Sequence, residues 1–294
     1  MVIVIAGPTG VGKTKLSIEL AKKLNGEVIN ADSTQVYKNL NIATAKVTEK
    51  EKENIIHHLF DIKEIDDDYT VYDYQKDARR TIDEILKRGK TPILVGGTGL
   101  YIKASLYDYQ FDKEEKKRDY SNYSDDELYE LLMKVDPNTN IHKNNRKRVE
   151  RAYAYFENHH IPFSSKEKNN TLLYDTIFIG LTTERSILYK RIDKRVDKMV
   201  TDGLLNEAKN IYESNIRTKA ITTPIGYKEL FPYFEGKAPL ENCLDTIKKN
   251  SRKYAKRQYT WFYHQLPMTW FTVCFEDFNK TIDEVYHFIN QKKS

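Results

Sequence analysis

The feature that most constrains this chain is its first stretch, MVIVIAGPTGVGKT, where branched apolar residues lead into a glycine-rich loop. The loop fits the pattern G-x-x-x-x-G-K-[S/T] with Gly7, Pro8, Thr9, Gly10, Val11, Gly12, Lys13 and Thr14. In such a loop the backbone N–H groups and the positive end of the next helix face one anion. The pattern therefore predicts a strand over 2–6, a phosphate-binding loop over 7–14 and a helix after it.

The two residues that close the loop have separate expected roles. Lys13 should reach the outer phosphates of the bound group, and the Thr14 hydroxyl is the expected ligand of Mg²⁺. A glycine turn without a ligand would not need a clear strand before it and an amphipathic helix after it. We therefore expect a true phosphate site, but the loop does not say whose phosphate binds or which bond breaks.

Residues 1–110 alternate between strand and helix patterns. EVINAD predicts a second strand, 73–88 a helix, and TPILVGGTG a third strand that opens into a glycine turn. TIFIGL predicts a return to the sheet, and MTWFTV a short edge strand. This alternation predicts an α/β fold, a P-loop-type parallel sheet flanked by helices.

A charge-rich segment interrupts this pattern. Leu128, Leu131, Leu132 and Val135 have helical spacing, and a second helix is predicted over about 145–158. We therefore predict a catalytic core formed by residues 1–111 and 166–294, whose C-terminal part is a basic helical region. Residues 112–165 are predicted to form an inserted helical domain.

The composition narrows the classes of function. No apolar run approaches the ~20 residues that cross a bilayer, so we expect no membrane association. Cys243 and Cys274 lack the spacing of a metal site, and the N-terminus does not resemble a secretory signal. The expectation is a reduced, cytoplasmic enzyme, with a monomer as the default oligomeric state.

A basic segment lies near the C-terminus of a chain whose net charge is +5. No acidic residue occurs between Asp245 and Glu276, and aromatic residues stand among the lysines and arginines. Basic residues recur at helical spacing: Lys249, Arg252, Lys253 and Lys256. A solvated helix face would explain that spacing equally well. The long stretch without acids and the interleaved aromatics favour a polyanion such as nucleic acid.

Asp32, directly after the second strand, is the carboxylate closest to the predicted phosphate site. The third strand ends ILVGGTG, without the acid that kinases and ATPases usually keep there. Because the carboxyl ends of parallel strands share one crevice, loop 7–14, Asp32 and turn 96–99 should converge. Asp32 could cap a helix, hold Mg²⁺ through water or act as a general base, and the residues alone leave these roles open. Three side chains that follow it can hydrogen-bond a base edge: Ser33, Thr34 and Gln35.

Nine segments occur in a characteristic order: GPTGVGKT, INADSTQVYKNLNIATAK, HHLFDI, PILVGGTGLYIKA, RKRVERAYAYF, LYKRIDKRVDKM, GLLNEA, IGYKEL and YAKRQYTWF. Together they resemble the tRNA dimethylallyltransferase (tRNA isopentenyltransferase) family over nearly the whole chain. The resemblance implies a prenyltransferase that moves a dimethylallyl group from dimethylallyl diphosphate to N6 of the adenosine 3′ of the anticodon in tRNA. Diphosphate is released, and the inserted domain closes over the anticodon stem-loop.

The resemblance also implies roles for single residues. The loop would bind the donor diphosphate, with Mg²⁺ neutralising its charge. Asp32 matches the proposed base of the family, which takes a proton from the poorly nucleophilic adenine amine. Thr98 matches a residue that lies near the bridging oxygen of the donor. Arg191, or else Arg195, matches a donor-side arginine; the simpler alternative is a surface pair with Asp193 or Asp197.

The implied RNA contacts come from five segments of the chain. The target base must be extruded from the loop to reach the site, which costs a few kcal/mol. The predicted tRNA-binding residues are Asp32, Ser33, Thr34, Gln35, Thr98, Lys147, Arg148, Arg151, Tyr227, Lys228, Lys256 and Arg257. The paired His57 and His58 match a family segment with a structural or positioning role. The chain departs from the usual IGTAKP segment, with Ala43 in place of glycine and Val47 in place of proline.

Three other functions compete with this interpretation. A small-molecule kinase would use the loop for ATP, but it would place a carboxylate near the transferred phosphate. An adenylate isopentenyltransferase would not need the inserted helical segment or the acid-free basic stretch. A non-catalytic nucleic-acid-binding module would have no use for Asp32 beside an intact phosphate loop.

Overall fold

The computed structural model describes residues 1–111, 118–165 and 171–293. These residues form two compact units, Met1–Tyr107 with Leu172–Ser294, and Asp108–Thr171. We call them the core unit and the inserted unit. The predicted domain boundaries at 112 and 166 lie outside the described residues.

The strands described in the core unit form one sheet of six parallel strands, in the order β3-β2-β4-β1-β5-β6. They are β1 (Val2–Ala6), β2 (Gly26–Asn30), β3 (His57–His58), β4 (Thr91–Gly96), β5 (Thr176–Thr182) and β6 (Thr269–Thr272). The predicted α/β class with a parallel, helix-flanked sheet is confirmed. The predicted edge strand is β6, whereas the opposite edge, the two-residue β3, was not predicted.

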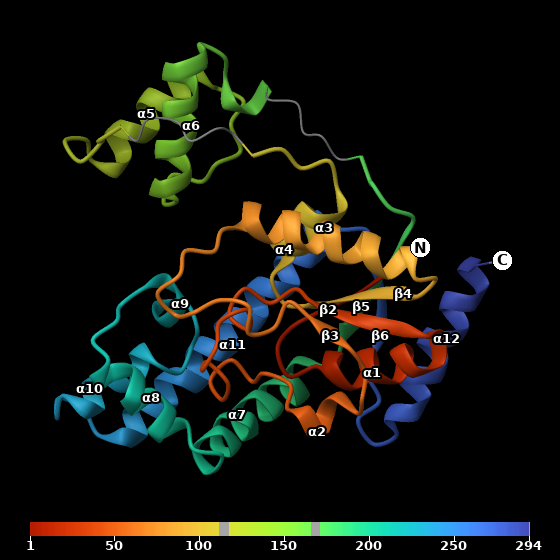
Figure 1. The fold of residues 1–294 in the computed structure, drawn as a ribbon. Coiled ribbons are helices and arrows are strands. Elements are labelled where there is room, and N and C mark those ends of the chain that lie inside the picture. The colour runs from red at the N-terminus through yellow and green to blue at the C-terminus, as the bar shows by residue number, and fades with distance from the viewer. Residues whose placement is uncertain (112–117, 166–170, 294) are drawn as a thin grey trace. The chain divides into compact units, whose positions relative to one another are not determined.

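Helices cover both faces of this sheet (Figure 1). The helical elements of the core unit are α1 (Lys13–Leu24), α2 (Glu49–Lys52), α3 (Val71–Lys87), α4 (Gly99–Leu106), α7 (Arg185–Thr201), α8 (Leu204–Glu213), α9 (Lys219–Thr222), η2 (Lys228–Leu230), α10 (Phe231–Phe234), α11 (Leu240–Gln265) and α12 (Phe278–Lys293). None of the described helices has the length and apolar character needed to cross a membrane.

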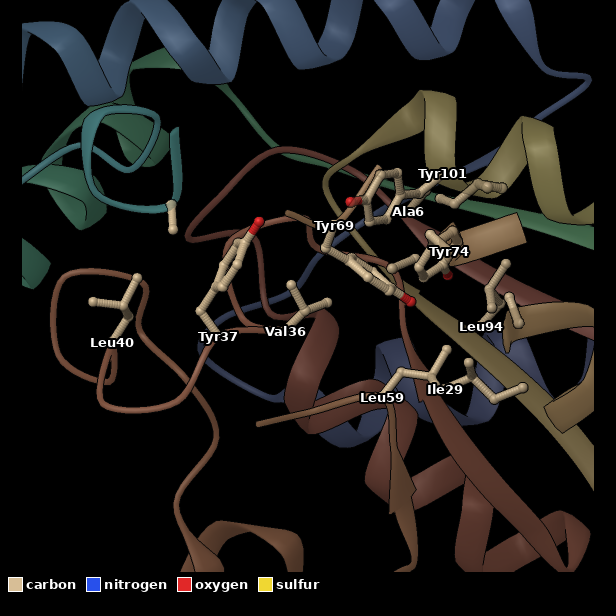
Figure 2. Close-up of a cluster of buried hydrophobic side chains, with 14 of the residues drawn as sticks. Ala6, Ile29, Val36, Tyr37, Leu40, Leu59, Tyr69, Tyr74, Leu94 and Tyr101 are labelled. Atoms are coloured by element: carbon tan, nitrogen blue, oxygen red, sulfur yellow. The ribbon is translucent and has the colours of Figure 1, made fainter. Parts of the chain in front are cut away.

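Strand β1 shows why the fold has a core on each side of the sheet. All five of its residues are fully buried, and successive side chains of a strand point to opposite faces. Val2, Val4 and Ala6 pack in the cluster that includes α3 and α4, part of which is drawn in Figure 2. Ile3 and Ile5 pack in the cluster that includes α1 and α12.

The inserted unit has a small core of its own. Its described helical elements are α5 (Asp125–Val135), α6 (Arg146–His159) and η1 (Phe163–Ser165). Leu128 and Leu132 of α5 pack with Val149 and Ala152 of α6. Ser124 caps α5, and the buried Asp136 accepts hydrogen bonds from Ser164. The predicted helical pattern of this segment is therefore present.

A buried carboxylate, Glu27, anchors β2 at the edge of the sheet. Its side chain is 1% exposed and contacts Lys90 at 2.8 Å, Arg88 at 2.6 Å and His58 of β3 at 2.7 Å. Burial raises the pKa of this carboxyl, but the hydrogen bonds from Lys90, His58 and Arg88 outweigh burial and lower the pKa to about 2. The contact with Glu27 fixes the His58 side chain at the edge of the sheet, which is a structural role.

This contact predicts a pH-dependent loss of stability in the Glu27→Gln variant. At neutral pH the variant should lose about 1–3 kcal/mol of unfolding free energy, because the basic groups lose their charged partner. The lowered pKa means that Glu27 stabilises the fold fully above about pH 4.5, and that this contribution is lost as pH falls toward about 2. Urea unfolding at several pH values should show the wild-type advantage shrinking below pH 4.5. The exposed Glu84→Gln should show no such dependence.

Candidate functional site

The loop Gly7–Thr14 lies between β1 and α1, as its sequence predicts. Gly12 stands at the N-cap of α1 with φ 106, and a Cβ there would lie 2.8 Å from Cε2 of Phe278. Only glycine tolerates this conformation and this contact. Among the described residues, no group accepts a hydrogen bond from the backbone N–H groups of residues 10–14. These consecutive donors at a helix N-terminus can bind an anion.

The Lys13 side chain lies across the phosphate loop, and its surroundings shift its pKa. Its Nζ donates to the carbonyl oxygens of Gly7 at 3.0 Å and Pro8 at 2.9 Å. Burial lowers the pKa of Lys13 to about 8; the nearby charge of Asp32 opposes this shift, and that of Arg195 adds to it. Lys13, Asp32 and Arg195 therefore share one electrostatic environment.

Both arginines singled out in KRIDKR reach the phosphate loop from α7. Arg195 Nη1 donates to Thr9 Oγ1 at 2.9 Å, and Arg191 Nε donates to the Gly10 carbonyl at 3.0 Å. Burial lowers the pKa of each guanidinium. The aspartates offered as alternative partners instead bind α11: Asp193 contacts Arg252 at 2.5 Å and Asp197 contacts Lys248 at 2.6 Å. The surface-pair alternative is therefore wrong for both arginines.

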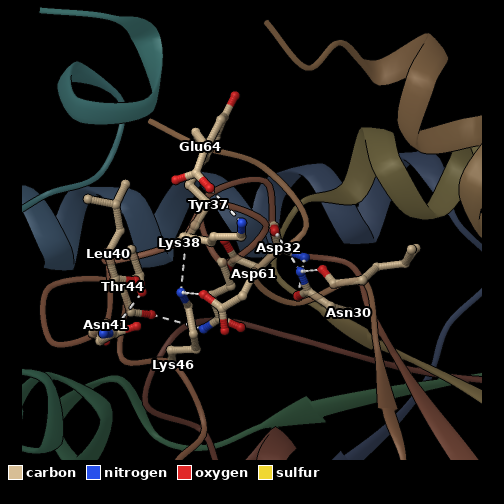
Figure 3. Close-up of polar contacts among 12 residues, drawn as sticks. Asn30, Asp32, Tyr37, Lys38, Leu40, Asn41, Thr44, Lys46, Asp61 and Glu64 are labelled. Carbon is tan, nitrogen blue, oxygen red and sulfur yellow. Dashed lines mark hydrogen bonds and ion pairs between the residues drawn. The ribbon is translucent and has the colours of Figure 1, made fainter. Parts of the chain in front are cut away.

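Asp32 is held at the end of β2 by the buried Asn30 (Figure 3). Asn30 Oδ1 accepts from the Asp32 N–H at 2.9 Å, and Asn30 Nδ2 donates to the Asp32 carbonyl at 3.1 Å. Asp32 Oδ1 accepts from the Thr34 N–H at 3.0 Å and from the Thr34 hydroxyl at 2.7 Å. Oδ2 receives no hydrogen bond from the described residues, so one carboxylate oxygen is fixed and the other is available for chemistry.

The glycine turn between β4 and α4 completes the site. The Thr98 N–H donates to the Ala31 carbonyl at 3.1 Å, and Thr98 Oγ1 accepts from the Ser33 N–H at 3.0 Å. These bonds place Thr98 beside the segment that carries Asp32. Tyr74 and Tyr101, both labelled in Figure 2, stack with ring centroids 3.9 Å apart. The Tyr74 hydroxyl donates to the Asn30 carbonyl. The convergence of loop 7–14, Asp32 and turn 96–99 is thus observed.

Two predicted RNA contacts of the core unit have other roles in this structure. The Gln35 amide donates to the carbonyls of Thr44 at 2.9 Å and Ala45 at 3.3 Å. The Tyr227 side chain is fully buried and its hydroxyl donates to Glu207 at 2.7 Å. The prediction that the Tyr227 side chain contacts RNA directly is therefore wrong, because this side chain is buried in the core unit. Lys228, next to it, is exposed.

Glu207 explains why Tyr227 is buried. This carboxylate of α8 accepts backbone hydrogen bonds from Asn41, Ile42 and Ala43, at distances from 2.9 to 3.1 Å. Tyr227 adds a further bond to the same carboxylate. Glu207 therefore holds the turn whose carbonyls orient Gln35, and Glu207 itself was not singled out from the sequence.

The candidate RNA residues of the inserted unit lie on α6. Lys147, Arg148 and Arg151 are exposed there. The acidic run that opens α5 is balanced within the unit, since Asp125 contacts Arg146 at 2.8 Å and Asp126 contacts Lys143 at 3.3 Å. Glu127 belongs to the N-terminal cap of α5. The acidic run therefore pairs with Arg146, the first residue of α6, and with Lys143, while the exposed Lys147 and Arg148 lie outside these two pairs.

Helix α11 divides its basic residues between two roles. Lys248 and Arg252 bind α7, whereas Lys249, Lys253, Lys256 and Arg257 are exposed. The inner face of the same helix carries two residues that sequence reasoning missed, Tyr254 and Gln258. The Tyr254 side chain interacts with Thr98, and Gln258 contacts both glycine loops. Their four-residue spacing with the buried Phe262 is the signal that could have marked this inner face.

Comparison with known proteins gives consistent matches. A model of the IPP transferase family matches residues 35–265. The tRNA dimethylallyltransferase of Anoxybacillus flavithermus is 47% identical over 300 residues, covering 99% of this chain and 96% of the relative. The crystal structure of the tRNA delta(2)-isopentenylpyrophosphate transferase of Staphylococcus epidermidis is similar with a TM-score of 0.76, 41% identity and 99% of each chain covered.

A eukaryotic dimethylallyltransferase acting on tRNA is also similar in structure. It has a TM-score of 0.77 and 37% identity, covering 89% of this chain and 69% of that one.

Proposed function

The chain belongs to the IPP transferase family, and on that premise we propose that it is a tRNA dimethylallyltransferase. It transfers the dimethylallyl group of dimethylallyl diphosphate to N6 of the adenosine 3′ of the anticodon, and releases diphosphate. The observation that carries the proposal is that the phosphate loop, which Arg195 contacts at Thr9, and Asp32 both lie against turn 96–99. Gln258 joins Thr9 to Gly97, and a Cβ at Gly97 would lie 3.7 Å from Asp32 Oδ2. A cationic diphosphate site and a carboxylate base are what this transfer requires.

The proposed reaction exchanges one bond to carbon for another. The bond between the prenyl carbon and the bridging oxygen breaks, the bond from that carbon to N6 forms, and the N6 proton passes to Asp32. The available oxygen, Oδ2, is the proposed proton acceptor, because Oδ1 already accepts from Thr34. Thr98 is proposed to meet the bridging oxygen, and loop 7–14 with Arg191 and Arg195 to bind the leaving diphosphate.

We propose Mg²⁺ as the metal that accompanies the donor. The exposed Thr14, at the second position of α1, would supply a hydroxyl ligand. No cluster of three or more His, Cys, Asp or Glu side chains suited to a metal occurs among the described residues. This fits Mg²⁺, which keeps several waters and takes other ligands from substrate phosphates. When bound, the ion neutralises charge on the diphosphate.

We propose that RNA contacts both units. The exposed Lys147, Arg148 and Arg151 make the inserted unit a tRNA-embracing domain, and Lys228, Lys256 and Arg257 extend the basic surface of the core unit. Ser33 and Thr34 lie beside Asp32 and would meet the extruded adenine. Contacts of the basic side chains with RNA phosphates would add affinity, whereas contacts of Ser33 and Thr34 with the adenine would determine which base is modified.

The decisive test is a transfer assay with labelled dimethylallyl diphosphate, Mg²⁺ and an unmodified anticodon stem-loop, run beside AMP and an ATP hydrolysis control. We expect label in the stem-loop alone. Label in AMP alone would indicate a free-nucleotide prenyltransferase. Rapid ATP hydrolysis without label transfer would indicate a kinase-like use of the loop and overturn the proposal.

Replacing Lys256 and Arg257 with alanine should weaken stem-loop binding and reduce its salt dependence. Each lost phosphate contact should lower the slope of log K against log salt by about 0.7–0.9. Fluorescence anisotropy at several salt concentrations measures this slope. The matched control removes two exposed lysines of α12, Lys280 and Lys292, and should leave the slope unchanged. Equal slopes for wild type and the α11 variant would show that this face does not contact RNA.

We propose that the enzyme works in the cytoplasm as a monomer. Among the described residues Cys243 and Cys274 are free thiols, which suits a reducing compartment. The residues of the proposed donor site come from one chain, from the segments that follow β1, β2 and β4 and from α7 and α11, so no second copy is needed to complete the site. Light scattering during size-exclusion chromatography tests the oligomeric state.

A further inference from the structure

Gln258 of α11 joins the two glycine-rich loops of the site. Its Oε1 accepts from the Thr9 N–H at 2.9 Å, and its Nε2 donates to the Gly97 carbonyl at 3.0 Å. The side chain is 5% exposed. Because an amide has distinct donor and acceptor ends, these two partners fix its orientation. A buried side chain thus connects loop 7–14 to turn 96–99.

The residues around Gln258 leave room for its side chain at Gly97 and hold Thr9 in place. A Cβ at Gly97 would lie 2.1 Å from Gln258 Nε2, so any larger residue at 97 would displace the amide. Thr9 is also held from the other side, since its hydroxyl accepts from Arg195. Arg252, six residues before Gln258, binds Asp193 of α7, the helix that carries Arg195. Helices α7 and α11 therefore hold Thr9 together.

We propose that Gln258 is a positioning residue for prenyl transfer, an inference that rests on the proposed function. Loop 7–14 binds the diphosphate, and Thr98, next to Gly97, meets the bridging oxygen. Gln258 sets the separation between these two parts of the donor site without touching the donor. Without it, the Thr9 N–H and the Gly97 carbonyl lose their buried partner, and the two loops are no longer held in register.

The first test is Gln258→Met, which keeps the length of the side chain and removes both hydrogen bonds. We expect the KM for dimethylallyl diphosphate and the Kd for inorganic pyrophosphate, measured by calorimetry, to rise by about tenfold or more. The Kd for the stem-loop should stay within about twofold, since the exposed face of α11 is intact. Gln265→Met, on the same helix but exposed, is the matched control and should behave as wild type.

A double-mutant cycle tests the same contact by steric means. Gly97→Ala should weaken pyrophosphate binding in the wild-type background because the new methyl group displaces Gln258. In a Gln258→Ala background the methyl group has room, so Gly97→Ala should add little further loss. Additive effects in the cycle would show that Gly97 and Gln258 act independently and would overturn the proposal.

The outcomes separate this inference from the proposed function. If thermal stability falls in Gln258→Met while KM, kcat and pyrophosphate affinity match wild type, Gln258 only supports the fold and the inference is wrong. If wild type transfers no label to the stem-loop, the proposed function fails. The pyrophosphate measurements then still decide whether Gln258 positions an anion-binding loop.

Discussion

Replacing Asp32 with asparagine should lower kcat by about 10²–10⁴-fold, the usual contribution of a general base. Asparagine can still accept the hydrogen bonds that Thr34 gives to Oδ1, so the local turn should persist. It cannot take the proton of the adenine amine. Because the base acts only in the transition state, kcat and kcat/KM should fall together while the Kd for the stem-loop stays near that of wild type.

Single-turnover transfer of labelled prenyl group, with enzyme in excess over stem-loop, measures this step directly. Asp66→Asn removes a carboxylate from an exposed position of the core unit and is the matched control. Near-wild-type turnover in Asp32→Asn would exclude Asp32 as the base. A loss of stem-loop affinity equal to the loss of rate would instead assign Asp32 a binding role.

Lys13→Met should weaken donor binding and slow transfer by about 10²–10³-fold, as expected when a donor to developing charge is removed. The wild-type pH profile should carry the signature of the same group. The Lys13 pKa is lowered to about 8, so the ammonium loses its proton as pH rises through 8. Pyrophosphate binding should therefore weaken above about pH 8 in wild type.

Calorimetric titration of pyrophosphate at several pH values tests this expectation. Ionisation of pyrophosphate itself is common to all variants, so the comparison isolates Lys13. Lys13→Met should lack the inflection near pH 8, whereas Lys15→Met, two residues along the helix and exposed, should retain it. An unchanged inflection in Lys13→Met would assign it to another group.

The parts of the fold that follow from local patterns were predictable. The apolar run of β1, the leucine spacing of α1 and the charge change after residue 111 are all visible within short windows. The two-residue β3 was missed because its contacts, Glu27 with His58 among them, join segments far apart in sequence. Helix α12 was also missed, although its buried Phe278, Ile282, Val285 and Ile289 recur at helical spacing and give a local signal.

The same distinction between local patterns and distant contacts applies to the residues of the site. The phosphate loop carries a motif, and the place of Asp32 follows from its position after a strand. The roles of Tyr227 and Gln35 could not be predicted, because the Glu207 carboxylate that orders this region comes from α8. Gln258 lies 249 residues from its partner Thr9, and nothing in either local sequence reports that bond.

That long separation has a consequence for synthesis of the protein on the ribosome. Thr9 of the phosphate loop emerges from the ribosome 249 residues before Gln258, its partner on the helix that braces the loop. Contacts this distant in sequence also form late, because a large chain loop must close first. A nascent chain would therefore carry an unbraced anion-binding loop until α11 has left the exit tunnel, and competence for catalysis would not arrive before that point.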